Sequence, residues 1–216
     1  CVAPPPAGDL PTGELPAVDA GSTPDEVTTP ADALEEEAQN SIDLALVGGR
    51  ILDGYGGPPI ENGVLLVADG RIVAIGNEAT VNVPEGTETI STQGMTVLPG
   101  LFDMHVHLML LGHGDYERWQ ERFGSRMVDE IMPLAARQLL HAGVTSARDL
   151  GADPDEILEV RRRIEAGEIE GSRLFVSGPF LQVEPYEPWE SEYRWAAGNV
   201  AQARQTVRDL AGRGVD

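Results

Sequence analysis

The chain has 216 residues, with 36 acidic against 15 basic side chains, a formal net charge of -21 and an isoelectric point near 4.4. Every basic residue is Arg, and so acidic a composition argues against nucleic acid or an anionic membrane surface as partner. The single Cys excludes an intrachain disulfide, and no apolar run approaches the ~18 residues needed to cross a bilayer.

Residues 1–40 differ in composition from the rest of the chain. They contain seven of the 16 Pro residues, nine acidic residues and no Arg. Such a segment buries too little apolar surface to offset its ordering entropy. We therefore expect residues 1–40 to form a disordered, self-repelling tether.

The chain opens on Cys1, followed by a Pro-rich polar run. This start is similar to that of mature bacterial lipoproteins, in which a signal peptide is cut just before a Cys that then carries lipid. The similarity implies lipidation of Cys1 and an extracytoplasmic protein anchored to a bacterial membrane, on the periplasmic side or at the cell surface. The alternative is that the first residue is an arbitrary boundary.

Residues 41–97 have the pattern of a small β-sandwich-like domain. Short apolar runs predict strands at 44–47, 50–52, 64–68 and 71–75, and within 87–97. Asp69-Gly70 lies between two of these runs and predicts a hairpin, because a type I′ turn needs positive φ at both positions. We assign packing, and no chemistry, to these strands.

The segment 96–108 predicts a strand that carries two histidines. Its side chains alternate between two faces, so Asp103, His105 and His107 share one face. The other face is apolar and could pack under a helix; it carries Phe102, Met104, Val106 and Leu108. Two imidazoles about 6–7 Å apart along one strand face can converge on a metal ion. The alternative is a pair of polar residues at the rim of a strand.

From residue 98 onward, predicted strands alternate with helices. We expect strands at 144–147 and 174–177, and helices within 126–142, from 153 to about 166, and from 199 to about 212. Pro133 predicts a kink or a helix start within the first of these helices. Repeated βα units imply parallel strands with right-handed crossovers. Residues 98–216 hold three such units, and a fourth strand is expected beyond them.

The segment 178–198 is long for a connection and rich in large side chains, namely Gln182, Tyr186, Trp189, Tyr193 and Trp195. A loop of this length inside a compact domain is usually functional. Its aromatic residues suit an apolar substrate pocket or an inter-subunit contact of a homo-oligomer. The alternative is a loop that packs on its own side chains.

The run from Pro99 to His107, Pro-Gly-Leu-Phe-Asp-Met-His-Val-His, resembles the first barrel strand of the metal-dependent amidohydrolase superfamily. Segments 139–151, 164–173 and 176–179 resemble the imidazolonepropionase-related and prolidase-like branch of that superfamily. The resemblance covers residues 43–216. It implies an α/β fold: the N-terminal part of a TIM-type (β/α)8 barrel, preceded by the small β-domain. A complete barrel alone takes about 250 residues, so the barrel here is expected to be incomplete.

The resemblance implies that His105 and His107 bind a divalent metal, expected to be zinc, as one or two ions. It also implies a carboxylated Lys on strand four, a His on each of strands five and six, and an Asp on strand eight that handles the proton. The chain contains no Lys, and catalytic zinc usually has three protein ligands. We therefore expect the missing C-terminal half of the barrel to be a necessary partner.

Four further residues are weighed as parts of the site. Asp103 could orient an imidazole as an outer-sphere acceptor, or hydrogen-bond loop backbone instead. Arg148 and Asp149 end strand two, where barrel active-site loops begin, and could contact substrate; the alternative is an internal ion pair. His113, on the loop after strand one, could also touch substrate, or lie exposed.

The resemblance implies a metal-dependent hydrolase. The complete protein would cleave amide, cyclic amide or dipeptide C–N bonds of a small-molecule or peptide substrate through a metal-activated water. These 216 residues alone are expected to be inactive. The alternative function is a catalytically inactive, lipid-anchored binding or scaffold module derived from the same fold.

Overall fold

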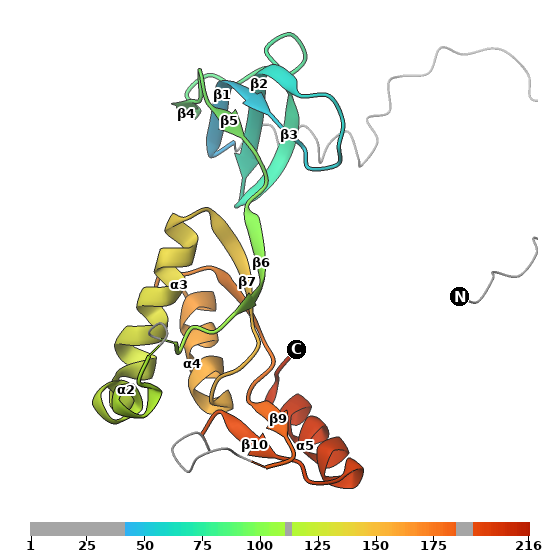
Figure 1. Ribbon diagram of the computed structural model, residues 1–216. Helices are drawn as coiled ribbons and strands as arrows, with labels where there is room; N and C mark the ends of the chain where they lie inside the picture. Colours follow the sequence, from blue (N-terminus) through green and yellow to red (C-terminus); the bar gives the residue numbers. More distant parts are fainter. Residues whose placement is uncertain (1–41, 111–113, 185–191) are drawn as a thin grey trace, which may run out of the picture. The chain divides into compact units, whose positions relative to one another are not determined.

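The computed structural model describes residues 42–110, 114–184 and 192–216, which divide into two compact units (Figure 1). In the described chain, the first unit contains residues 42–51 and 59–97. The second contains residues 52–58 together with the described residues from 98 to 216. No helix among the described residues is long and apolar enough to span a membrane.

The first unit is one five-stranded sheet. Its strands are β1 (Leu44–Ile51), β2 (Ile60–Ala68), β3 (Arg71–Asn77), β4 (Glu88–Ser91) and β5 (Thr96–Val97). The order is β3-β2-β1-β4, and β5 also pairs with β1; β1 runs antiparallel to β2 and parallel to β4 and β5. The predicted hairpin is confirmed, because Asp69 and Gly70 connect β2 to β3 with φ of 50° and 68°. A sandwich partner for this sheet stays a prediction.

The second unit is built on a parallel sheet of β6 (Leu101–Val106), β7 (Val144–Asp149) and β8 (Arg173–Val176), in the order β6-β7-β8. This confirms parallel strands in chain order. Helix α3 (Met132–His141) follows β6 and helix α4 (Pro154–Glu165) follows β7. Both helices contribute buried side chains to one core with the sheet, whose central residues include Met132, Ala136, Ala147, Ile157, Val160, Leu174 and Val176.

Helix α4 begins where the local sequence predicts. The side chain of Asp153 caps it by accepting hydrogen bonds from the N–H groups of Asp155 and Glu156, at 3.0 and 3.1 Å. Pro154 occupies the first turn, where its missing N–H costs nothing. Gly167 follows the helix with φ of 70°, a conformation that glycine adopts readily. The helix therefore has local signals at both ends.

Glu156, in the first turn of α4, should make the stability of the protein depend on pH. Burial raises its pKa to about 7, and the nearby charges of Asp153 and Glu192 act in the same direction. A carboxyl group whose pKa is raised in the folded state stabilises that state below its unfolded pKa, and this contribution is lost as pH rises through 7. Glu156→Gln should therefore raise the free energy of unfolding by roughly 1–2 kcal/mol at pH 8.5, after allowance for solvent screening.

At pH 4 the variant and the parent should unfold with equal free energy, since Glu156 is then protonated in both states. Urea denaturation at the two pH values measures the difference. Glu165→Gln makes the same chemical change at an exposed position at the end of the same helix and serves as the matched control. A variant less stable than the parent at pH 8.5 would contradict the prediction.

The region before α3 differs from the predicted single helix within 126–142. The loop predicted after the histidine strand contains helix α2 (Tyr116–Phe123), which is capped by Asp115. A 3₁₀ turn η1 (Gly124–Arg126) and a π-helical turn η2 (Met127–Ile131) then lead into α3. Pro133 lies in the first turn of α3, so the predicted helix start near this residue is confirmed. The π-helical turn is wider than an α-helical turn, and Pro133 accounts for it. The ring of a proline clashes with the carbonyl four residues earlier in a regular α-helix, and a wider turn relieves this clash.

The segment 178–198 is not one loop. It contains the short strands β9 (Phe180–Gln182) and β10 (Arg194–Ala196), which pair in parallel and precede α5 (Val200–Arg213). Strands of three residues are too short to leave a periodic signal. Tyr193 is 6 % exposed and belongs to the core of the unit, which favours the packing interpretation for this residue. Tyr186 and Trp189 lie outside the described residues.

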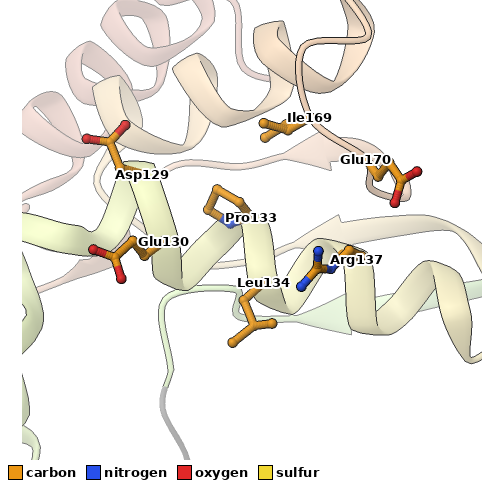
Figure 2. Close-up of a pocket in the computed structure, with 7 residues that line it drawn as sticks. All are labelled: Asp129, Glu130, Pro133, Leu134, Arg137, Ile169 and Glu170. Atoms are coloured by element: carbon orange, nitrogen blue, oxygen red, sulfur yellow. The ribbon is translucent and has the colours of Figure 1, made fainter.

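The helix layer also contains a cavity of about 370 Å³ (Figure 2). It is lined by residues of η2, of the first two turns of α3 and of the loop after α4: Asp129, Glu130, Pro133, Leu134, Arg137, Ile169 and Glu170. Three of these seven are carboxylates and one is Arg. The hollow lies among helices, whereas the histidine pair is on a strand of the sheet.

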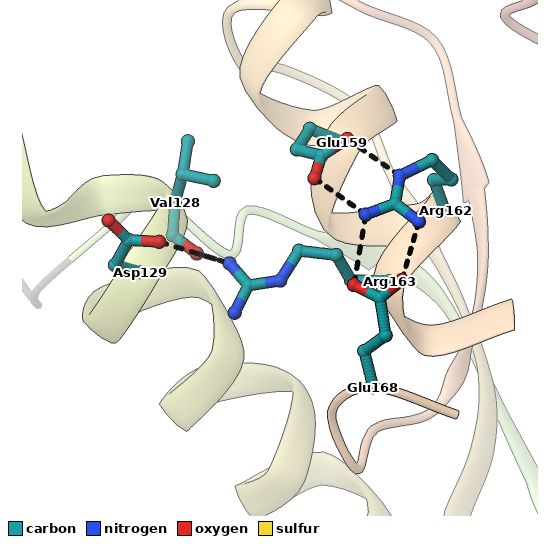
Figure 3. Close-up of polar contacts among 6 residues, drawn as sticks. All are labelled: Val128, Asp129, Glu159, Arg162, Arg163 and Glu168. Carbon is teal, nitrogen blue, oxygen red and sulfur yellow. Dashed lines mark hydrogen bonds and ion pairs between the residues drawn. The ribbon is translucent and has the colours of Figure 1, made fainter. Parts of the chain in front are cut away.

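Two arginines of α4, Arg162 and Arg163, form hydrogen bonds and ion pairs with neighbouring residues (Figure 3). Arg162 bridges Glu159 on the same helix and Glu168 beyond it, at 2.7–2.9 Å. Arg163 instead reaches η2, where it donates to the carbonyl of Val128 and to the carboxylate of Asp129, both at 3.1 Å. The side chain of Arg163 is only 21 % exposed, so water screens its ion pair with Asp129 less than it screens a fully solvated pair. The ion pair can therefore help to orient α4 against η2.

Candidate metal centre

The two histidines lie at the carboxyl end of β6. His105 is in the strand and His107 follows its last residue, and their Nε2 atoms are 3.2 Å apart. The ring centroids are 5.1 Å apart with the planes nearly perpendicular. Two nitrogens on one tetrahedral zinc, each about 2.0–2.1 Å from the ion, are about 3.3 Å apart. The pair is therefore spaced as two ligands of a single ion, and imidazole is a common ligand for zinc.

His107 is the more enclosed of the two rings. Its Nδ1 is buried and has no hydrogen-bond partner among the described residues, and its ring centroid lies 5.2 Å from that of Phe180. Burial lowers the pKa of His107, and the neighbouring His105 and Arg194 lower it further, while the main chain of Gly151 acts in the opposite direction. The neutral ring, which is the form that binds metal, is thus favoured at neutral pH.

The strand that carries the histidines is shorter and less regular than predicted. β6 begins at Leu101, separate from β5, and its pairing with β7 shifts register between Asp103 and Val106. Asp103 pairs with Ala147 and Val106 with Asp149, so β6 holds one more residue than β7 over this stretch. The extra residue interrupts the regular pairing of β6 with β7 between Asp103 and Val106.

The predicted apolar face of this strand is only partly buried. Phe102 and Met104 are 65 % and 53 % exposed, whereas Val106 contacts the core and Leu108 is buried within it. No helix among the described residues therefore covers Phe102 and Met104. β6 is an edge strand of the described three-stranded sheet, and its register shift separates the two halves of the predicted face.

Asp103 contacts main chain rather than a ring. Its Oδ1 accepts a hydrogen bond from the backbone N–H of His105 at 3.1 Å. This is the local turn-like contact that short carboxylates favour. The contact holds the backbone at His105, and it corresponds to the backbone alternative for this residue.

Arg148 and Asp149 do not pair with each other. The Nε of Arg148 donates to the carbonyl of Met104 at 3.2 Å. Asp149 is fully buried, and its two oxygens accept hydrogen bonds from the N–H groups of Leu108 at 2.7 Å and Gly151 at 3.0 Å. Burial raises the pKa of Asp149 to about 6, although both N–H groups lower it. The internal ion pair weighed for these neighbours is not formed.

The remaining predicted site residues add nothing to the described centre. Cys1 and His113 lie outside the described residues. In residues 42–110, 114–184 and 192–216, no group of three or more His, Cys, Asp or Glu side chains is placed to hold a metal. The described centre is thus a two-histidine arrangement, fewer than the three protein ligands usual for catalytic zinc.

Two neighbours of His107 were not found from sequence. Phe180, on β9, packs against the imidazole of His107. The guanidinium group of Arg194 lies 4.8 Å from the centroid of the Phe180 ring. Gly151 lies against Phe180, because an added Cβ would come within 2.4 Å of the Phe180 ring. The one local feature of the sequence that relates to these contacts is Gly151, two residues after Asp149, and a glycine at this position predicts only a turn at the end of a strand.

Comparison with known proteins agrees with this reading of the strand. Residues 96–214, more than half of the chain, match the model of the Amidohydrolase family. A dihydroorotase from Geobacter metallireducens is 42 % identical over 73 residues, which are 33 % of this chain and 16 % of that protein. An imidazolonepropionase from Symbiobacterium thermophilum is 35 % identical over 105 residues, covering 42 % of this chain and 24 % of the relative.

Solved structures extend the similarity to most of the chain. Molinate hydrolase superposes with a TM-score of 0.70 at 25 % identity, over 82 % of this chain and 44 % of that one. A prolidase complexed with N-methylphosphonate-L-proline gives a TM-score of 0.64 at 25 % identity, over 80 % and 44 % of the two chains. The chain therefore spans less than half the length of these proteins. It belongs to the amidohydrolase family.

Proposed function

We propose that this chain supplies the first two metal ligands of a metal-dependent hydrolase that acts on C–N bonds. The observation that carries the proposal is the 3.2 Å separation of the His105 and His107 Nε2 atoms at the carboxyl end of β6. Active sites of (β/α)8 enzymes lie at this end of the strands. Zinc is the expected ion, with one or two ions in the complete site.

The residues of the chain have distinct parts in this proposal. His105 and His107 would hold the ion through Nε2, and the lowered pKa of His107 leaves its ring neutral near pH 7. Phe180 packs against the ring of His107 and limits its contact with water. A bound divalent ion would supply Lewis-acid polarisation of a carbonyl and lower the pKa of a coordinated water.

Further ligands and the general base are proposed to come from outside these 216 residues, in the rest of a (β/α)8 barrel. Two histidines are too few for a catalytic zinc site, and the matched structures are more than twice as long as the part that aligns. The substrate is proposed to be an amide, a cyclic amide or a dipeptide, since relatives include a dihydroorotase, an imidazolonepropionase and a prolidase. The inactive-module alternative draws no support from these relatives.

A further proposal concerns residues 1–40, which would act as a tether because they are rich in Pro and in acidic side chains.

The function is tested by assay of the full-length protein against dipeptides, N-acyl amino acids and lactams. We expect hydrolysis of at least one class, a loss of at least about tenfold after treatment with 1,10-phenanthroline, and recovery on addition of zinc. The non-chelating 1,7-phenanthroline is the matched control and should leave the rate unchanged. Hydrolysis that persists after complete removal of metal, or no hydrolysis of any C–N substrate, would contradict the proposal.

A further inference from the structure

We propose that Asp149 is a positioning residue for His107, holding the imidazole so that Nε2, and not Nδ1, is presented beside His105. The inference rests on the proposed metal site for its consequence. Its structural part concerns only how one ring is held, and can be tested without metal.

The contacts of Asp149 join the ends of two strands around His107. Oδ2 accepts from the N–H of Leu108, the residue that follows His107, at 2.7 Å. Oδ1 accepts from the N–H of Gly151 at 3.0 Å. A main-chain bond of 3.0 Å from the N–H of Leu150 to the carbonyl of Val106 adds a third link between these segments. The carboxylate thus secures the backbone just after His107 to the turn that follows β7.

The hydrogen bonds at position 149 require a carboxylate. Asp149 is 0 % exposed, and its two hydrogen bonds go to different oxygens. An amide in the same place could accept one of the two N–H groups through its oxygen but would turn an NH₂ group toward the other. A buried N–H facing another donor is left unsatisfied, which is costly in the interior.

The turn that Asp149 holds also positions Phe180, which packs against the imidazole of His107. Gly151 lies so close to Phe180 that an added Cβ would be 2.4 Å from two ring atoms. Phe180 in turn packs against His107, with ring centroids 5.2 Å apart. The position of the Gly151 main chain therefore fixes where Phe180 lies, and Phe180 limits how the imidazole can rotate.

The consequence for His107 follows from its two nitrogens. Nε2 faces the Nε2 of His105, while Nδ1 is buried without a partner among the described residues. Nε2 is the nitrogen at ligand spacing, so the orientation of the ring decides whether its lone pair can be directed at a shared ion. If the hydrogen bonds of Asp149 are lost, the ring can rotate, and Nε2 is no longer held toward that ion.

The experiment compares Asp149→Asn with the parent in the full-length protein. In the metal-free state, the ring ¹H and ¹⁵N resonances of His107 should indicate a single ring orientation in the parent, and they should shift or broaden in the variant. Competition titration with Zn²⁺ should show affinity reduced by about 10- to 100-fold, the range for loss of a group that orients a ligand. Circular dichroism checks that the variant is folded.

Asp153→Asn is the matched control. It makes the same chemical change four residues away, but both N–H groups bound by Asp153 reach the single oxygen Oδ1, which Asn retains. Neither the His107 shifts nor the zinc affinity should change. If Asp149→Asn does not fold, Gly151→Ala provides the second test, because it leaves Asp149 intact and displaces Phe180. It should disturb the same shifts and weaken zinc binding.

The outcomes separate this inference from the function. A folded Asp149→Asn variant with parental His107 shifts and parental zinc affinity would overturn the positioning role. Altered His107 shifts in the variant, together with no zinc binding by the parent, would support the positioning role while contradicting the proposed metal site.

Discussion

If the proposed activity is correct, replacing either His105 or His107 with Ala should lower turnover of the full-length protein by more than about 100-fold, beyond the roughly 10- to 100-fold cost of losing a group that only orients a ligand. Each change removes one of two nitrogens that lie 3.2 Å apart, and the remaining imidazole cannot by itself define the position of an ion. Turnover and bound zinc should fall together. Steady-state kinetics and metal analysis by mass spectrometry measure both quantities on the same preparation.

The fold should tolerate these two changes. His105 is exposed and His107 lies beyond the last residue of β6, so truncation of either ring removes little core packing. His141→Ala is the matched control, because it deletes an exposed imidazole at the end of α3 and should leave turnover and zinc content unchanged. A His105→Ala, His107→Ala double variant with full turnover would eliminate the metal-site proposal.

Ile157→Ala should lower the free energy of unfolding by about 3–4 kcal/mol, within the range of 2–5 kcal/mol typical for such truncations. Ile157 is 0 % exposed and belongs to the core shared by α4, α3 and the parallel sheet. Its removal leaves a cavity in addition to the lost transfer free energy, since a close-packed interior relaxes only in part. Urea denaturation followed by circular dichroism gives the difference.

Leu134→Ala provides the comparison for this core prediction. Leu134 is on α3 and 45 % exposed, so its truncation should cost less than about 1 kcal/mol. Equal losses for the two variants would mean that the buried face of α4 is not the main source of stability in this unit. A larger loss for Ile157→Ala would agree with the core described here.

Much of the architecture could be predicted because its signals are local. Asp153 and Pro154 start α4 through contacts within one helical turn, and Asp69-Gly70 makes its hairpin through the φ angles of two adjacent residues. The same holds for the histidine pair, since residues two apart at a strand end lie close together in nearly any fold that keeps the strand. The family likewise follows from the short run between Pro99 and His107, and the match over residues 96–214 confirms it.

Apart from helix α2, the elements that were not predicted are short or irregular. β9 and β10 have three residues each, and η2 is a single π-helical turn, so none of them repeats a pattern often enough to be recognised. The register shift in β6 is invisible for a different reason. It depends on which residues of β7 lie opposite, and that pairing joins positions more than 40 residues apart.

The sequence by itself determined the parallel βα order of the second unit and the family of the chain, and it identified the candidate metal ligands. Only the tertiary structure decided what surrounds His107: the wall made by Phe180, the close approach of Gly151 and the carboxylate of Asp149 bound to two main-chain N–H groups. Periodicity and capping are properties of neighbouring residues, so they can be read along the chain. The orientation of a ring depends on contacts between segments separated by 41 to 73 residues, and these exist only once the sheet has assembled.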